Sequence, residues 1–421
     1  MASGRSLAVL LYGEHLADLH QTGGGAHRLQ YREVGRGAGI SLAMPPREHP
    51  YTKRQVDPFL EGLLPDREET KEALGRKFDV SGRNPFALLE HIGLDCAGAV
   101  QFCRPDQVPD VLNQAGELIP REEREIGDRL RELRANDASS WTAAREKWSL
   151  AGAQGKFALR VESGAWCSVT GAEPTTHIIK PGVSEFGAQA LNEHICLATA
   201  RRLGLPAATS QYQEFDGQPA IIVDRYDRRR TEDGRVLRVH QEDLCQALSV
   251  YPRDKYESTG GPRAVQIIDL LRRASTTRGG LDIHQFLDGL VLNYLLGAPD
   301  AHAKNYSVLL IGRTVRLAPL YDIASGFPYD ADDQHGLRSA AMKIGGESRF
   351  GRVARRHWER FATEIAYPAE RLIERVEELA RQLPDALSSV LDAEREVAAE
   401  LRNRLLDPVA TNCQKTRQDL R

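Results

Sequence analysis

The sequence predicts an α+β protein in which a β-rich region with one helix precedes a mostly helical region. Its 421 residues exceed the roughly 250–300 residues at which a single core tends to divide, so two or more domains are expected. After residue 148, short β-branched and apolar runs predict strands, and after residue 241 the apolar residues recur with helical spacing. These observations indicate two lobes of different secondary structure.

The first 147 residues predict a small domain and a connection. Residues 1–105 are expected to form an α+β domain, with strand-like runs near both of its ends and helical patterns between them. The runs lie at 6–18 and 97–102, and the helical patterns at 55–77 and 85–93. Residues 106–147 are rich in Pro, Asp, Glu and Arg, which predicts a charged linker or a solvated helix, centred on 121–134.

The two lobes are predicted at 148–240 and 241–421. In the first lobe a single helix at 186–203 lies among strands, and in the second an apolar strand pair interrupts the helices. The predicted strands are 157–161, 165–169, 175–180, 208–214 and 219–224, followed by the pair 306–311 and 314–318. A β-rich lobe followed by a helical lobe with a hairpin is the order of a protein-kinase-like two-lobed fold.

Charge and cysteine content limit the class of protein. Lys and Arg number 56, Asp and Glu 59, and the net charge is −3, which predicts neither a protein that coats nucleic acid nor an acidic tail. The six cysteines are scattered without C-x-x-C pairs, as is typical of reduced cytosolic thiols. The N-terminus lacks a signal-sequence pattern, and no apolar stretch approaches the roughly 18 residues of a membrane span. A cytoplasmic protein without membrane contact is therefore expected.

The segment 297–307 (GAPDAHAKNYS) carries the clearest chemistry. It follows the apolar helical pattern 286–296 and leads into a predicted strand, so Asp300 and Asn305 lie on one short loop. Phosphoryl transfer needs an acceptor for the substrate hydroxyl proton and oxygen ligands for magnesium, and kinase loops place an Asp and an Asn five positions apart for these tasks. Alone, this spacing is weak, because Asp and Asn are common turn residues.

A second aspartate strengthens the kinase interpretation. Asp322 comes just after the predicted hairpin, seventeen residues beyond Asn305. At that place a carboxylate would bridge magnesium to the nucleotide phosphates, as the aspartate of the D-F-G motif does. The loop, the hairpin and the second carboxylate together favour a phosphotransferase over simple turn chemistry.

Two segments of the β-rich lobe could hold phosphates. Lys180 ends a β-branched run that is predicted to be a strand. In a kinase-type fold, a lysine on such a strand of the small lobe binds the phosphates, so Lys180 is the candidate for this cation. In the following helix Glu193 could hold this lysine, or it could equally be a surface residue. The small residues of 151–156 could offer backbone amides to phosphates or form an ordinary glycine turn. They are not a Walker loop, because Phe157 follows Lys156.

Seven ordered motifs make the chain resemble the HipA family. They are residues 149–154 (SLAGAQ), 177–181 (HIIKP), 225–229 (RYDRR), 241–246 (QEDLCQ), 255–258 (KYES), 297–307 and 321–323 (YDI). The motifs span about 149–323, and the apolar pattern at 6–102 is similar to the N-terminal domain of that family, so the resemblance covers most of the chain.

This resemblance implies a serine/threonine protein kinase toxin of a type II toxin–antitoxin pair. Such a kinase would transfer the γ-phosphate of ATP, with Mg²⁺, to a protein of the translation apparatus, as characterised relatives do to aminoacyl-tRNA synthetases. Growth arrest and persistence would follow. The implied partners are a HipB-like helix-turn-helix antitoxin, which would neutralise the toxin, and operator DNA, reached mainly through that antitoxin.

The resemblance also implies roles for individual residues. Asp300 becomes the proton acceptor, Asn305 and Asp322 the magnesium ligands, Lys180 the phosphate-binding lysine, and Ser149 the site of an inactivating autophosphorylation. The other implied nucleotide contacts are the phosphate loop (Ala151, Gly152, Ala153, Gln154, Gly155 and Lys156), the adenine hinge (Asp224, Arg225 and Tyr226), His302, Lys304 and Tyr321.

Other interpretations stay open at the level of sequence. Small-molecule and lipid kinases also use Asp, His and Asn in this loop, and a non-catalytic co-repressor could bridge an antitoxin to DNA, although the intact set of catalytic residues argues against it. For the basic run 225–230, a solvated ion-pair patch is favoured over phosphate binding. For Ser149, a hydroxyl that caps its own turn is the alternative to autophosphorylation.

Overall fold

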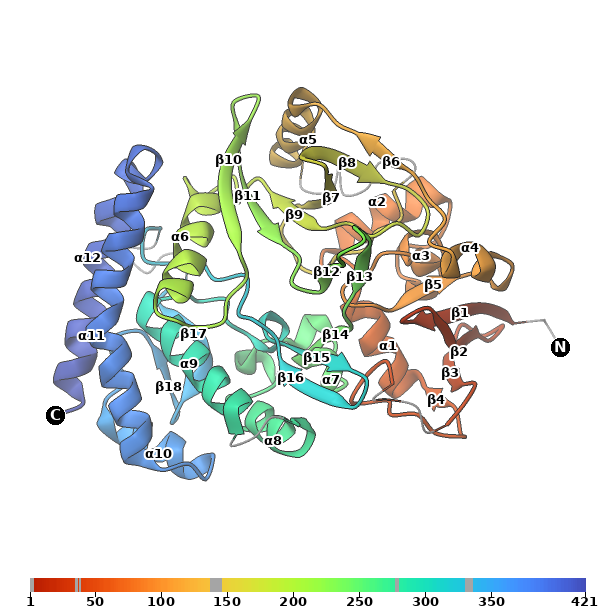
Figure 1. Ribbon diagram of the computed structural model, residues 1–421. Coiled ribbons are helices and arrows are strands. Elements are labelled where there is room, and N and C mark those ends of the chain that lie inside the picture. The colour runs from red at the N-terminus through yellow and green to blue at the C-terminus, as the bar shows by residue number, and fades with distance from the viewer. Residues whose placement is uncertain (1–3, 35–36, 38, 137–145, 277–279, 330–335) are drawn as a thin grey trace. The chain divides into compact units, whose positions relative to one another are not determined.

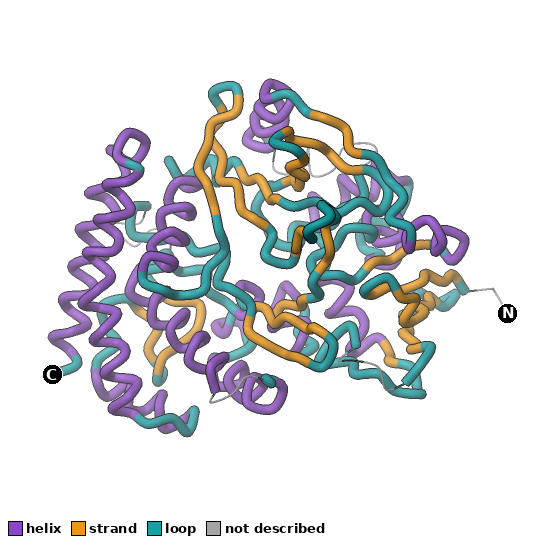
Figure 2. The backbone as a smooth tube through the Cα atoms, in the orientation of Figure 1, coloured by secondary structure: helices purple, strands orange, loops and turns teal. Residues whose placement is uncertain are grey.

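The computed structural model describes residues 4–34, 37, 39–136, 146–276, 280–329 and 336–421, and Figures 1 and 2 draw its helices and strands. The chain forms two compact units. Unit 1 comprises Met1–Ser184, Gln213–Arg253 and Val308–Val315, and unit 2 comprises Glu185–Tyr212, Asp254–Ser307 and Arg316–Arg421. Both units therefore contain several separate stretches of the chain.

The N-terminal part of unit 1 is an antiparallel sheet covered by helices (Figure 1). The strand order is β4-β3-β2-β1-β5, and the apolar faces of the strands meet helices α1 and α3 in a core that includes Leu29, Phe59 and Phe86. The predicted helical pattern 55–77 is divided into two helices, because Pro65 lies between them and cannot continue a helix. The bounds are β1 Arg5–Leu11, β2 Glu14–Gln21, β3 His27–Tyr31, β4 Tyr51–Thr52, β5 Gln101–Cys103, α1 Lys53–Gly62, α2 Glu68–Phe78, α3 Pro85–Ile92 and α4 Val108–Leu112.

A second sheet of unit 1 contains the strands predicted after residue 148. Its order is β10-β11-β9-β7-β8-β6. Both β7 and β8 coincide with their predicted ranges to within one residue, and β9 begins two residues late. The bounds are β6 Leu118–Pro120, β7 Phe157–Glu162, β8 Ala165–Val169, β9 His177–Lys180, β10 Ser210–Phe215 and β11 Gln218–Asp224, followed by β12 Arg228–Arg230, β13 Val236–Arg238, β14 Gln241–Asp243 and α7 Leu244–Ala247.

The stretch 106–147 is more than a linker. Its strand β6 pairs with β8, and helix α5 (Glu123–Ala135) packs on β11. The helix is charged, as predicted, but it is not solvated all round, because Ile126, Leu130 and Leu133 recur on one face and are buried. Residues 137–145 of this stretch lie outside the described part of the chain.

Unit 2 is mostly helical and is organised around helix α9 (Leu281–Leu296), which is buried along nearly its whole length. Helices α8, α11 and α12 pack against it, and α6 packs against α11. The predicted hairpin is β15 and β16, and most of it, Val308–Val315, belongs to unit 1. The bounds are α6 Gln189–Arg202, α8 Ala264–Ala274, β15 Ser307–Ile311, β16 Thr314–Leu317, β17 Ser339–Ile344, β18 Glu347–Arg349, α10 Arg355–Glu364, α11 Ala369–Ala393 and α12 Arg395–Asp419.

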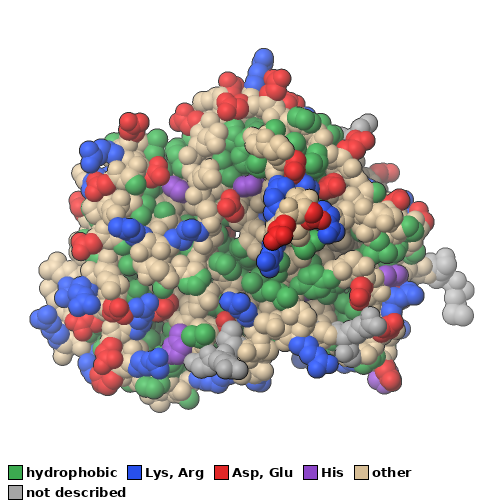
Figure 3. Space-filling model, viewed as in Figure 1, with side chains coloured by type: hydrophobic (Ala, Val, Ile, Leu, Met, Phe, Trp, Pro, Cys, Tyr) green, Lys and Arg blue, Asp and Glu red, His purple; other side chains and the backbone are tan. Residues whose placement is uncertain are grey.

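The surface carries both signs of charge. On the face shown in Figure 3, basic and acidic side chains are interspersed, in keeping with the net charge of −3. All six cysteines are buried. Among the described residues, no helix has both the length and the apolar character needed to cross a bilayer.

Candidate active site

The loop that carries Asp300 begins at a sharply defined end of helix α9. Gly297 adopts a φ of +65°, the left-handed conformation that ends many helices and that glycine adopts without strain. A Cβ atom at this position would lie 2.5 Å from the ring of Phe327. The next amide, of Ala298, donates a hydrogen bond of 2.8 Å back to the carbonyl of Asn293. The start of the loop is therefore fixed by both conformation and packing.

Asp300 and Asn305 are joined within this loop. The carbonyl oxygen of Asp300 accepts a hydrogen bond of 2.7 Å from Nδ2 of Asn305 and one of 2.8 Å from the amide of His302. This bond uses an N–H of the Asn305 side-chain amide, whose acceptor atom is Oδ1. The carboxylate of Asp300 points outward, with 58% of its side chain exposed. The loop thus presents a carboxylate and an amide oxygen from a braced backbone.

The surroundings of the Asp300 carboxylate include a residue whose role the sequence analysis did not identify. The hydroxyl of Tyr256 donates a hydrogen bond to Oδ1 of Asp300, and the Tyr256 ring meets the ring of His302 edge-on at 4.8 Å. Nε2 of His302 lies 3.5 Å from the same oxygen. Burial lowers the pKa of His302 to about 4 although Asp300 raises it, so the imidazole is neutral at pH 7.

Tyr321 connects the loop to Asp322. Its hydroxyl donates to the carbonyl oxygen of Lys304 at 2.9 Å and lies 2.7 Å from Oγ of Ser307. Asp322 itself has a φ of +57°, which aspartate tolerates better than most residues because its short polar side chain can bond locally. Such a conformation at a functional carboxylate fits a side chain whose direction is imposed by its surroundings.

The segment after Asp322 is held by helix α6. Nδ2 of Asn192 donates to the carbonyl of Ser325 at 2.8 Å, and the Ser325 amide returns a bond of 3.2 Å to Oδ1 of Asn192. Oγ of Ser325 donates to the carbonyl of Leu296 at 2.6 Å. Helix α6, the Asp322 segment and the last turn of α9 are therefore tied together. The role of Asn192 could not be predicted from the sequence, because its partner Ser325 is 133 residues away.

Lys180 and Glu193 occupy different units. Lys180 is the last residue of β9, is paired with Ile221 of β11, and is largely buried. Glu193, on α6 of unit 2, is 1% exposed, so its interpretation as a surface residue is wrong. A pairing between the two stays a prediction. Unit 2 brings together Asp300, His302, Lys304, Asn305, Tyr321 and Asp322, whereas unit 1 contains Ser149, the phosphate loop, Lys180 and the hinge.

The predicted phosphate loop is folded against the N-terminal part of unit 1. Gly152 has a φ of +106° and its carbonyl accepts a bond of 3.0 Å from the amide of Asp66. Nζ of Lys156 donates to the carbonyl of Ala151 at 2.7 Å, which closes the loop on itself. Ser149 is 1% exposed, and its hydroxyl donates to the carbonyl of Leu63 at 2.7 Å. Since that partner is 86 residues away, Ser149 does not cap its own turn.

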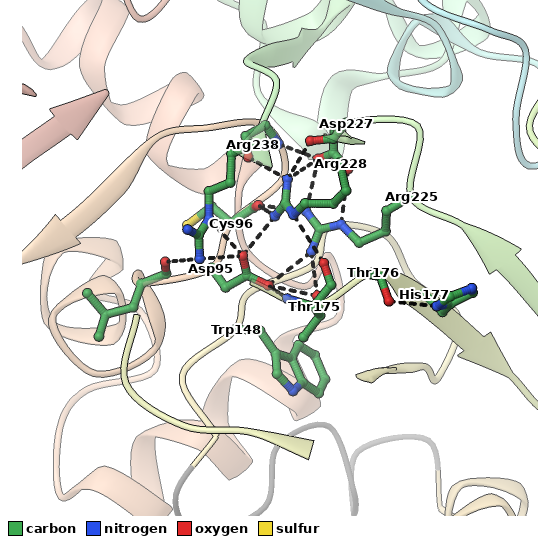
Figure 4. Close-up of polar contacts among 12 residues, drawn as sticks. Asp95, Cys96, Trp148, Thr175, Thr176, His177, Arg225, Asp227, Arg228 and Arg238 are labelled. Atoms are coloured by element: carbon green, nitrogen blue, oxygen red, sulfur yellow. Dashed lines mark hydrogen bonds and ion pairs between the residues drawn. The ribbon is translucent and has the colours of Figure 1, made fainter. Parts of the chain in front are cut away.

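The predicted hinge carries a correction. Arg225 and Arg228 were expected in a solvated patch, but their side chains are 1% and 2% exposed and form ion pairs with buried aspartates. The Arg225 side chain is therefore engaged inside unit 1 (Figure 4). Asp224, by contrast, pairs with His177 at 3.3 Å near the surface, and the Tyr226 hydroxyl donates to Gln241. Contacts of the hinge with a nucleotide would have to come mainly from its backbone.

The donor set fits magnesium and ATP. Asn305 and Asp322 offer an amide oxygen and a carboxylate, the hard oxygen ligands that Mg²⁺ prefers. Within the described residues no group of three or more His, Cys, Asp or Glu side chains could hold a metal ion. Mg²⁺ takes few ligands from the protein and the rest from phosphates and water.

An Asp and an Asn braced on one loop, a second Asp after a hairpin, and a lysine at the end of a strand in a β-rich region define a protein kinase. Comparison with known families supports this class. Residues 148–387 match the HipA-like C-terminal domain and residues 7–103 match the HipA N-terminal domain. The chain belongs to the HipA family.

Individual relatives agree with this assignment. A Sinorhizobium fredii protein named "Putative kinase Y4mE" is 34% identical over 91% of this chain and 90% of its own length. The serine/threonine-protein kinase toxin HipA of Shewanella oneidensis is 30% identical, over 81% of this chain and 78% of its own. A solved structure described as a complex of HipA, HipB and operator DNA from the same organism superposes with a TM-score of 0.79 at 25% identity, covering 98% of this chain and 99% of that chain.

These comparisons confirm three predictions made from the sequence. They are the family, the α+β kinase-like fold class and the activity class of a protein kinase. The protein is a HipA-like serine/threonine kinase toxin.

Proposed function

We propose that this kinase transfers the γ-phosphate of ATP to a serine or threonine of a translation-apparatus protein, an aminoacyl-tRNA synthetase being the expected class. The observation that carries the proposal is the exposed Asp300 carboxylate, braced to Asn305 and touched by the Tyr256 hydroxyl. The substrate class rests on the family resemblance. Arrest of growth and persistence would follow from such a modification.

The side chains divide the work of phosphoryl transfer. Asp300 accepts the proton of the attacking hydroxyl, and Tyr256 orients the carboxylate that does so. Neutral His302 adds no positive charge that would weaken Asp300 as an acceptor. Lys180 binds phosphate, and Asn305 and Asp322 hold Mg²⁺, which supplies charge neutralisation at the phosphates when bound.

Ser149 is proposed as a self-inactivating site. Its hydroxyl is buried against the Leu63 carbonyl, so phosphorylation requires the segment to leave this position. A phosphate adds a charge of about −1.5 to −2, and phosphorylated Ser149 would not fit in this buried position. The adjacent phosphate loop, which should receive ATP, could then not return to its original conformation. We expect mass spectrometry after incubation with ATP and Mg²⁺ to find phosphate on Ser149 and to correlate it with loss of ATP affinity. Unmodified Ser149 in an active enzyme would contradict this.

The proposed partners are a HipB-like helix-turn-helix antitoxin that neutralises the kinase and, mainly through it, operator DNA. The solved relative is a complex of HipA with HipB and operator DNA. The net charge of −3 supports contact with DNA mainly through a partner rather than alone. We place this activity in the cytoplasm.

The test is phosphate transfer from radiolabelled ATP to purified aminoacyl-tRNA synthetases, compared between the wild type and Asp300→Ala. The variant should lose about 10²–10⁴-fold in rate, because it lacks the proton acceptor. A matched control is Asp269→Ala, which removes another exposed carboxylate of unit 2, on α8, paired with Arg272 at 3.1 Å. Full activity of Asp300→Ala would refute the proposed role.

The same assay separates the alternatives. Phosphorylation of small hydroxyl compounds but of no protein would favour a small-molecule or lipid kinase. If the wild-type protein assembles with its antitoxin on DNA but does not turn over ATP, a non-catalytic co-repressor would be favoured.

A further inference from the structure

Asp95 lies at the centre of a buried ionic cluster in unit 1 (Figure 4). It follows helix α3 and so belongs to the N-terminal part of the chain, whereas its side-chain partners all come from the β-rich part after residue 148. Its Oδ2 accepts hydrogen bonds from Thr175 Oγ1 (2.7 Å), the Thr175 amide (3.0 Å) and Arg225 Nη1 (3.2 Å), and its Oδ1 from Arg228 Nη2 (2.8 Å) and Arg238 Nε (3.0 Å).

The cluster sets two carboxylates against three guanidinium groups. Asp227 supplies a second carboxylate, 2.9 Å from Nη2 of Arg225 and 3.1 Å from Nη1 of Arg228. Burial alone would raise the pKa of Asp95, but Arg228, Arg238 and Arg225 hold it well below its usual range. Asp95 is therefore charged at physiological pH. Removing it would leave three buried guanidinium groups with one carboxylate.

The contacts of Asp95 reach three segments of the predicted nucleotide site. Thr175 lies two residues before strand β9, which ends at Lys180. Arg225 directly follows β11 and belongs to the predicted adenine hinge. The backbone of Asp95 also pairs with the segment before the phosphate loop, since its carbonyl accepts a bond of 3.0 Å from the Ser149 amide. One residue therefore contacts the approaches to the lysine strand, the hinge and the phosphate loop.

This position argues for a purpose beyond stability. A buried ion pair is weak evidence of stabilisation, because apolar residues of similar volume often stabilise a core at least as well. Its directional hydrogen bonds do, however, define one relative placement of the groups they join. The groups that Asp95 joins lie next to the lysine strand, the hinge and the phosphate loop. The relative positions of these three segments must be correct to within about one ångström for ATP to be held productively.

We infer that Asp95 is a positioning residue for ATP, through which the N-terminal part of the chain sets the geometry of the lysine strand, the hinge and the phosphate loop. The inference rests on the proposed use of ATP and deepens it. It assigns to the N-terminal part a direct influence on nucleotide affinity, although Asp95 itself need not touch the nucleotide.

The test compares three variants of the whole chain. Asp95→Asn keeps the shape and an oxygen acceptor for Thr175 but loses the charge. Thr175→Val retains every charge and removes only the hydroxyl that connects Asp95 and Arg225. Asp57→Asn is the matched control: it removes a buried carboxylate of the N-terminal part, paired with His27 at 2.7 Å, that lies outside the Asp95 cluster.

Affinity for a fluorescent ATP analogue with Mg²⁺ is measured together with the melting temperature without nucleotide. We expect the Kd to rise about 10- to 100-fold in Asp95→Asn and about threefold or more in Thr175→Val, where the two buried hydrogen bonds of one hydroxyl are lost. The Kd of Asp57→Asn should be unchanged even if its melting temperature falls by as much as that of Asp95→Asn. In turnover assays the defect should appear in KM for ATP, with kcat at saturating ATP largely retained.

The outcomes are distinguishable. If Asp95→Asn does not fold, Thr175→Val decides the matter. Wild-type affinity in every variant that folds would overturn the positioning role while leaving the proposed function intact, as would an equal loss of affinity in Asp57→Asn. Failure of the wild-type chain to bind the analogue would overturn the proposed function, and the inference with it.

Discussion

At the scale of single residues, the proposed phosphoryl transfer depends on how the carboxylate of Asp300 is held. Asp300 is an exposed residue of a largely buried loop, and an unconstrained exposed side chain would sample several rotamers. Tyr256 donates to one of its oxygens, and the buried ring of His302 packs against Tyr256 and lies beside the same oxygen. The acceptor is thus oriented before substrate arrives, which is the arrangement that favours a rapid proton transfer.

Tyr256→Phe should therefore lower kcat about tenfold, because it removes one hydrogen bond to a charged group and keeps the ring that packs on His302. The KM for ATP should not change. Steady-state kinetics with a protein substrate measure both. The control is Tyr251→Phe, in unit 1, whose ring lies under Arg253 at 4.1 Å. An unchanged kcat in Tyr256→Phe would show that the phenol does not orient Asp300.

Asp322 combines a predicted metal ligand with an unusual backbone conformation, φ +57°. Asp322→Asn should fold normally, because asparagine also tolerates this conformation, but it loses the negative charge that attracts Mg²⁺. We expect the affinity for ATP with Mg²⁺ to fall about 10- to 100-fold, whereas the affinity in EDTA should be nearly that of the wild type. A titration in which the variant retains the full gain of affinity on adding Mg²⁺ would remove Asp322 from the metal site.

At the scale of elements, the first residues of the second lobe form a strand, although this lobe was predicted to be helical. Residues from 241 onward start with the short strand β14, which belongs to unit 1. Glu242 of this strand is 1% exposed, and its Oε1 accepts a bond of 2.7 Å from the amide of Leu42. Burial raises the pKa of Glu242 to about 8. The strand thus carries a carboxyl group that is mainly protonated at neutral pH.

This burial predicts a pH dependence of stability. Between about pH 4.5, the usual pKa, and about pH 8, the folded chain retains a proton that the unfolded chain has released. The contribution of Glu242 to the free energy of unfolding therefore falls as pH rises across this range. Glu242→Gln, which mimics the neutral acid, should be more stable than the wild type by about 1–3 kcal/mol at pH 7.5.

Denaturant unfolding at pH 5 and pH 7.5 checks this expectation. The advantage of the Gln variant should shrink at the lower pH, where both the folded and unfolded wild-type chains retain more of the proton. Equal stability of the two proteins at pH 7.5 would mean that Glu242 is ionised in the folded chain.

At the scale of the whole molecule, the N-terminal part and the β-rich part belong to one compact unit. The matches to family domains end at residue 103 and resume at residue 148, but the Asp95 cluster spans that boundary. The sequence alone predicts a separate domain that begins at residue 148. The buried charges argue otherwise.

A truncated chain that begins at Lys147 should not fold. Without Asp95, Arg225 and Arg228 keep Asp227 as a carboxylate partner, but Arg238 loses its ion pair, and an uncompensated buried charge costs about 3–5 kcal/mol. Circular dichroism should show no cooperative melting. The control is the two parts expressed separately and mixed, which should regain a melting transition if they assemble. A truncated chain that melts cooperatively by itself would show that the two parts are independent.

Local features were well predicted from the sequence. Strands β7 and β8, the loop joining Asp300 to Asn305, and the hairpin before Asp322 all lie where spacing alone placed them. The reason is physical: alternation, helical periodicity and turn chemistry act over a few neighbouring residues, and so does the spacing of a catalytic loop.

Only the tertiary structure decided which distant residues meet. Tyr256 reaches Asp300 across 44 residues, and Asp95 reaches Arg225 across 130. The run 225–230 is as basic as a solvated patch would be, yet Arg225 and Arg228 are buried, because Asp95 from the N-terminal part pairs with both of them in addition to Asp227 within the run. A charged residue is stable inside a protein only when it has a partner there, and the arrival of Asp95 depends on the path of the whole chain.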